Sequence, residues 1–140
     1  MPEAGEYRDL KRIWLFSGCS QAELRKIQKV LHRVTVSAGT LLVEEGQPGL
    51  LFFIVVDGRA TVQRGSHPVA TLGPGDHFGE LSLLDEEPRS ASVVRETDMT
   101  LLVLRQRHFQ KVLRTSPSMV RKLLAAMSVR LRDSDARAYH

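Results

Sequence analysis

A stretch near the middle of the chain, LGPGDHFGELSLLDEEPRSASVV at positions 72–94, carries side chains suited to binding a small anion. Arg89 supplies a guanidinium that can pair with a negative charge, and Ser90 adds a hydroxyl donor beside it. Gly79 allows the backbone a close approach or a φ angle that other residues avoid. Glu80 supplies an acceptor for a hydroxyl group. Together these groups suit a ligand with one negative charge and a free hydroxyl.

The local structure predicted around these side chains would add backbone donors. Gly73, Pro74 and Gly75 predict a turn, and residues 80–84 can form one helical turn between two strands. The start of a helical turn exposes unpaired N–H groups, which together with the local dipole attract an anion. A small cyclic phosphodiester needs donors for its phosphate, an acceptor for its ribose hydroxyl and apolar walls for its base. The segment offers all three kinds of group.

The same residues allow other interpretations. Glu80 and Arg89 can instead form an ion pair within the protein. His77 could join Glu80 or Asp76 in a metal or acid–base site, but no third ligand or nucleophile stands at a suitable spacing. Ser82 lacks the GxSxG pattern of a hydrolase. The sequence therefore predicts a protein that is not an enzyme and that needs no metal or cofactor.

Hydrophobic spacing predicts helices at both ends of the chain. Ser20 and Glu23 form a capping-box pattern, which predicts a helix within an N-terminal segment of about residues 10–33. Helical spacing returns over residues 105–140 and predicts two helices there. Between them, Ser116 suits an N-cap and Pro117 suits the first helical turn.

Strands are predicted between these helices, over residues 34–104. Short β-branched runs recur there every eight to twelve residues, interrupted by Gly and Pro, which is typical of an antiparallel sandwich or barrel. The run LLFFIVV at positions 50–56 is apolar throughout and should be buried on both faces of its sheet. Asp57 and Gly58 then predict a hairpin turn.

Length and composition predict one soluble domain over residues 1–140. The chain has 140 residues, of which 42% are hydrophobic and 26% charged, and this balance argues against a disordered or low-complexity chain. No apolar run approaches the length of a membrane span, and the first residues lack the apolar core of a signal peptide. We therefore expect a cytoplasmic protein. The single cysteine, Cys19, cannot form an internal disulfide and is expected to fill space in the core.

The charge distribution leaves a further interpretation open. The net charge is +4, yet residues 1–104 hold 11 basic and 14 acidic side chains, whereas residues 105–140 hold nine basic and two acidic ones. Basic side chains around a helix usually form a solvated face, and a nucleic-acid surface is the alternative.

The anion-binding stretch closely resembles the phosphate-binding cassette of cyclic nucleotide-binding domains, which we place at residues 75–92. Members of that family read approximately Gly-Asp-x-x-Gly-Glu, a short helix, and then Arg with small residues, and the matching positions here are Gly75, Asp76, Gly79, Glu80, Arg89, Ser90 and Ala91. Residues 15–27 resemble the leading helix of the family, and residues 38–62 resemble its first strands. The resemblance implies an eight-stranded antiparallel β-roll, or jelly roll, with an N-terminal helix and two C-terminal helices. It also implies a cyclic nucleotide inside the roll, most commonly cAMP, with cGMP as the alternative.

The resemblance also assigns roles to single residues. Glu80 would bind the ribose hydroxyl and Arg89 the exocyclic phosphate oxygens, and the Gly79 amide and Ser90 would support them. Ser134 falls where a hydroxyl contacts adenine in the family's final helix. The complete set of implied ligand-binding residues is Phe78, Gly79, Glu80, Leu81, Ser82, Arg89, Ser90, Ala91 and Ser134. The chain departs from the family at Leu50, where an acid is common, and at Val94 and Arg95, where a small residue is usual.

The final helix suggests how a bound ligand would be sensed. In the family this helix covers the base, and in bacterial regulators it also forms the dimer. The resemblance therefore implies a regulatory sensor that acts through a homodimer or a downstream effector domain. The sequence ends soon after this helix, so DNA binding by the chain alone is not expected. The alternative function is a degenerate roll that docks a protein partner without binding a ligand.

Overall fold

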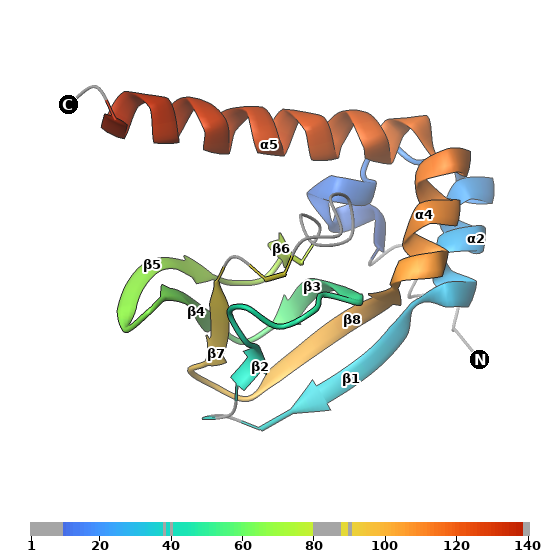
Figure 1. Ribbon diagram of the computed structural model, residues 1–140. Coiled ribbons are helices and arrows are strands. Elements are labelled where there is room, and N and C mark those ends of the chain that lie inside the picture. The colour runs from blue at the N-terminus through green and yellow to red at the C-terminus, as the bar shows by residue number, and fades with distance from the viewer. Residues whose placement is uncertain (1–9, 38, 40, 80–87, 90, 139–140) are drawn as a thin grey trace. The chain divides into compact units, whose positions relative to one another are not determined.

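The computed structural model describes residues 10–37, 39, 41–79, 88–89 and 91–138, with the backbone alone over the last six of these (Figure 1). The chain divides into two compact units, one within residues 30–110 and one formed by residues 1–29 with 111–140. No described helix combines the length and the apolar character needed to cross a bilayer.

The first unit contains a β-roll of eight antiparallel strands in two four-stranded sheets (Figure 1). The strand order is β1-β8-β3-β6 in one sheet and β2-β7-β4-β5 in the other. The strands are β1 (His32–Val36), β2 (Leu41–Val43), β3 (Leu51–Asp57), β4 (Ala60–Arg64), β5 (His67–Leu72), β6 (His77–Phe78), β7 (Ser92–Arg95) and β8 (Met99–Arg105). The predicted eight-stranded antiparallel roll is therefore confirmed.

The inner faces of the two sheets share one apolar core. Strand β3 is buried on both faces from Phe52 to Val55, as the apolar run predicted, and its Phe53 and Val55 belong to this core. Leu50, at the start of the run, is 61% exposed and departs from that prediction. Side chains from both sheets meet in this core, namely Phe53, Val55, Ala60, Leu72, Phe78, Val93, Met99 and Leu101. Burial of these side chains on strands distant in the sequence holds the roll closed.

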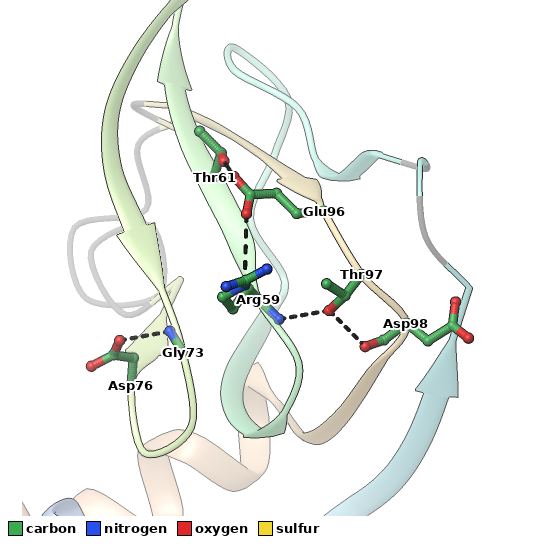
Figure 2. Close-up of polar contacts among 7 residues, drawn as sticks. All are labelled: Arg59, Thr61, Gly73, Asp76, Glu96, Thr97 and Asp98. Atoms are coloured by element: carbon green, nitrogen blue, oxygen red, sulfur yellow. Dashed lines mark hydrogen bonds and ion pairs between the residues drawn. The ribbon is translucent and has the colours of Figure 1, made fainter.

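Two chain reversals are tied together at one end of the roll. The Arg59 amide donates to Thr97 Oγ1 at 2.9 Å (Figure 2). The Glu96 amide donates to the Arg59 carbonyl. Glu96 also accepts a hydrogen bond from Thr61. Gly58 lies in a turn, as predicted, but the turn does not close a hairpin, because β3 and β4 belong to different sheets. Gly58 has a φ of 91°, and a Cβ there would lie 2.3 Å from the Asp98 carbonyl oxygen. The close approach of the two turns therefore requires glycine at this position.

The helices lie where the spacing predicted them. The 3-10 helix η1 (Trp14–Phe16) and the helix α2 (Gln21–Val30) precede the strands, and α4 (Gln106–Thr115) and α5 (Pro117–Ala138) follow them. The capping box of α2 is reciprocal: the Ser20 amide donates to Glu23 Oε1, and the Glu23 amide donates to Ser20 Oγ, both at 3.1 Å.

Ser116 differs in detail from its predicted role. Helix α5 does begin directly after it, but its hydroxyl donates to Glu23 Oε2 at 2.5 Å and so links the starts of α2 and α5. This hydrogen bond is the main cause of a lowered pKa of the Glu23 carboxyl group. Cys19 is buried beside Ser116, as expected for a residue that fills space, and burial raises the pKa of its thiol.

Candidate functional site

Arg89 lies inside the first unit and is anchored by backbone oxygens. Its side chain is only 7% exposed. Nη1 donates to the Gly79 carbonyl at 3.0 Å, and Nη2 donates to the Leu51 carbonyl at 2.7 Å. A guanidinium keeps its charge at any physiological pH, and carbonyl oxygens accept hydrogen bonds from its donors. These two contacts fix the orientation of a permanent positive charge between the start of β3 and the end of β6.

Gly79 is required at its position because the guanidinium occupies the space beside it. Its φ is 97°, a backbone conformation that favours glycine. A Cβ on Gly79 would lie 2.7 Å from Arg89 Nη1 and 2.7 Å from the Leu51 carbonyl oxygen. The sequence predicted a close approach at Gly79, and within the described residues the approaching groups are Arg89 and Leu51.

The backbone of Arg89 is held by the loop between β2 and β3. The Arg89 amide donates to the Gln47 carbonyl at 2.8 Å, and the Gly46 amide donates to the Arg89 carbonyl at 2.9 Å. Together with the two side-chain contacts, this pair of hydrogen bonds holds the residue at both ends. Main-chain groups of Gly46, Gln47 and Leu51 therefore belong to the site. The sequence pattern did not identify them.

Apolar side chains line the roll next to these contacts. Phe78 precedes Gly79, is 7% exposed, and stacks on Phe53 with ring centroids 4.7 Å apart and an angle of 11° between the rings. Both rings belong to the core that Val93 and Leu72 complete. An anion held by Arg89 would therefore meet an aromatic and aliphatic wall.

The remaining implied ligand residues divide into two groups. Ala91 is half-buried directly before β7. Glu80, Leu81, Ser82 and Ser90 lie outside the described residues, as does the predicted helical turn over residues 80–84, so the alternative Glu80–Arg89 ion pair stays a prediction. Ser134 lies on α5 in the second unit, and its side chain is outside the described part. The structure thus brings together Phe78, Gly79 and Arg89 of the implied set.

The two departures from the family lie at different places in the first unit. Leu50 is 61% exposed, and its carbonyl accepts a hydrogen bond from the Gln106 amide at 3.1 Å. Arg95 is 9% exposed and pairs with Ala60 across the sheet. His77, considered as a metal ligand or acid–base residue, is buried in β6 against Phe52, and the described residues contain no cluster of His, Cys, Asp or Glu able to hold a metal ion.

Known proteins of similar sequence include regulatory subunits and ion channels. The chain is 31% identical over 113 residues to a cAMP-dependent protein kinase regulatory subunit of Hypocrea atroviridis, covering 81% of this chain and 24% of that protein. It is 41% identical over 103 residues to a cyclic nucleotide-gated potassium channel of Mesorhizobium japonicum, covering 74% and 28%. The chain thus spans about a quarter of the length of these relatives.

Solved structures agree with this similarity and match the fold. The catabolite activator protein of Thermus thermophilus has a TM-score of 0.80 and 32% identity, over 89% of this chain and 61% of that one. The regulatory domain of Toxoplasma gondii protein kinase A, crystallised with cAMP, has a TM-score of 0.76 and 27% identity, over 89% and 48%. The family described as "Cyclic nucleotide-binding domain" matches residues 33–116, which include every strand after β1 and the anchored Arg89. The chain therefore belongs to the cyclic nucleotide-binding domain family.

Proposed function

We propose that the roll binds a cyclic nucleotide, with cAMP as the first candidate, and that the chain acts as a regulatory sensor of this ligand. The observation that carries the proposal is the burial of Arg89, whose guanidinium is held by two carbonyl oxygens beside Gly79. If the roll were only a docking module, we would expect the Arg89 side chain to point outward to solvent. The side chain is 7% exposed, which argues against the docking function.

In the proposed complex, each group meets a different part of the ligand. The guanidinium of Arg89 pairs with the phosphate through charge-assisted hydrogen bonds, supported by the Gly79 amide and the Ser90 hydroxyl. Glu80 accepts from the ribose 2′-hydroxyl. The aromatic wall formed by Phe78 and Phe53 borders the apolar part of the site. Ser134 on α5 is the proposed contact to the base.

The choice of cAMP rests on relatives, which differ among themselves. The Toxoplasma gondii regulatory domain was crystallised with cAMP. A Trypanosoma brucei chain with a TM-score of 0.80 and 25% identity is described as the regulatory subunit of a cAMP-independent protein kinase A. The ligand must therefore be identified by direct measurement on this protein.

A thermal-shift screen with cAMP, cGMP and cyclic dinucleotides tests the proposal. A ligand that binds only the folded protein adds about 2.7 kcal/mol of stability at 100 times its Kd, so the preferred nucleotide is expected to raise Tm clearly. The matched control is 5′-AMP, which keeps the adenine and ribose but lacks the cyclic diester. If none of the cyclic nucleotides raises Tm at millimolar concentration, the sensor is rejected and the docking function is favoured.

We further propose that occupancy is transmitted through α4 and α5. A ligand shifts a conformational equilibrium only if it binds one of the two states more tightly than the other. Helices that follow the site directly in the chain are well placed to change conformation with it. Saturating ligand is therefore expected to change amide hydrogen exchange over residues 106–135. Unchanged exchange at saturation would contradict transmission through these helices.

The same samples test the proposed homodimer. Large apolar side chains of α5 are exposed, among them Leu124, Val129 and Leu131. A second copy of this chain would cover them through a two-fold contact along the helix. Sedimentation velocity with and without ligand is expected to show a dimer. A monomer at all concentrations would contradict the homodimer and favour an effector domain as the partner.

A further inference from the structure

Glu45 connects three segments of the first unit through its backbone and its side chain. Its amide donates to Ser92 Oγ at 2.9 Å. Its carboxylate oxygen Oε1 accepts a hydrogen bond from the Gly65 amide at 3.0 Å. The residue lies in the loop between β2 and β3, Ser92 begins β7, and Gly65 forms the turn between β4 and β5.

These contacts surround the segment that contains Arg89. Strand β7 lies between β2 and β4 in its sheet, and Arg89 precedes the first residue of β7 by three positions. Of the two residues after Glu45, Gly46 donates its amide to the Arg89 carbonyl, and Gln47 accepts from the Arg89 amide. Glu45 therefore connects two segments. One is the loop after β2, which holds the backbone of Arg89, and the other is the hairpin formed by β4 and β5. We call this set of contacts the Glu45 bridge.

The hairpin that the bridge reaches, formed by β4 and β5, includes an edge strand. Strand β5 is at the edge of its sheet, and every residue from His67 to Thr71 is exposed. A hydrogen bond from a backbone amide to a carboxylate is charge-assisted and stronger than one to a neutral acceptor. A side chain that fixes this turn to the β2–β3 loop therefore reduces the motion of both segments.

We propose that Glu45 is a positioning residue for ligand binding, because its bridge keeps the loop that holds Arg89 in place. The inference rests on the proposed function, since it assumes that Arg89 binds the ligand phosphate. Charge alone predicts the opposite effect: an acidic side chain near an anion site weakens binding, so its removal should strengthen binding slightly. If removal of Glu45 lowers the affinity for the nucleotide, the cause is therefore the lost hydrogen bond and not the lost charge.

Three variants separate the hydrogen bond from the charge. Glu45→Ala removes both. Glu45→Gln removes the charge and keeps an acceptor for the Gly65 amide. Glu44→Ala removes the same charge from the neighbouring exposed position, where among the described residues only the backbone carbonyl forms a hydrogen bond, from the Gln47 amide.

We expect Glu45→Ala to weaken cyclic nucleotide binding by about two- to tenfold, the range for one lost hydrogen bond, mainly through faster dissociation. Glu45→Gln should bind within about twofold of wild type, and Glu44→Ala should bind equally well or slightly more tightly. Without ligand, amide exchange should rise over residues 64–67 and 89–92 in Glu45→Ala and in neither of the other two variants. Tm should fall by no more than a few degrees in Glu45→Ala, which loses one hydrogen bond, and should stay nearly unchanged in the other two variants.

Each other result overturns the inference in a distinct way. Equal exchange in Glu45→Ala and Glu44→Ala would mean that the bridge does not restrain Arg89. Faster exchange with unchanged affinity and dissociation rate would mean that the bridge is structural only. If wild-type protein binds none of the nucleotides, the proposed function fails, while the exchange measurement still decides whether the bridge restrains Arg89.

Discussion

Arg89→Ala is expected to weaken cyclic nucleotide binding by about 2 to 5 kcal/mol, which corresponds to a loss of roughly thirtyfold to several thousandfold. The variant removes the proposed partner of the ligand phosphate from a buried position. It also leaves the carbonyl oxygens of Gly79 and Leu51 without the donors they have now. Isothermal titration of both proteins with the preferred nucleotide measures the difference.

The control for this experiment is Arg33→Ala, which removes the same charge from an exposed position on the edge strand β1. It should bind like wild type. Arg89→Lys should fall between wild type and Arg89→Ala, because an ammonium keeps the charge but cannot donate to two carbonyls and a phosphate in the same planar arrangement. Superimposable isotherms for wild type and Arg89→Ala would remove Arg89 from the binding site.

Gly79→Ala is expected to abolish detectable binding and to lower the free energy of unfolding by about 1 to 3 kcal/mol. Part of the loss of stability comes from a φ of 97°, which an alanine adopts only with strain. The effect on binding has another origin. The new Cβ would lie 2.7 Å from both Arg89 Nη1 and the Leu51 carbonyl oxygen, and Leu51 belongs to the paired strand β3. The guanidinium is therefore the group that must move.

Gly75→Ala provides a matched control for the backbone effect. Gly75 has a φ of 92°, and a Cβ there would meet no atom within 4 Å. This variant should lose stability in chemical denaturation but retain its affinity for the nucleotide. Comparison of the two variants isolates the contribution of the guanidinium. If Gly79→Ala and Gly75→Ala bind equally well, the contact between Gly79 and Arg89 is not needed for binding.

Several of the predictions that the structure confirms depend on neighbours within a few residues. The capping box of Ser20 and Glu23, the turn at Gly58 and the buried part of β3 are local patterns. The hairpin predicted at Gly58 was wrong, because the pairing partners of β3 and β4 are distant strands. Strand β6 shows the limit of such patterns. It contains only His77 and Phe78, too few residues for a hydrophobic period, and its pairing with β3 identifies it as a strand.

The sequence by itself determined the residue types of the candidate site. It identified Arg89 as the cation and Gly79 as the position of close approach, and the spacing between them matched a known cassette. Those conclusions needed only chemical identity and order along the chain, both of which a sequence contains.

Only the tertiary structure decided what holds these residues in place. Arg89 contacts the Leu51 carbonyl across 38 positions of the sequence, and Ser116 contacts Glu23 across 93. A backbone carbonyl is the same group in every residue, so no sequence signal marks Leu51 or Gln47 as a partner of Arg89. Their roles arise because sheet pairing and core burial bring distant segments together. The free energy of that packing comes from residues throughout the roll.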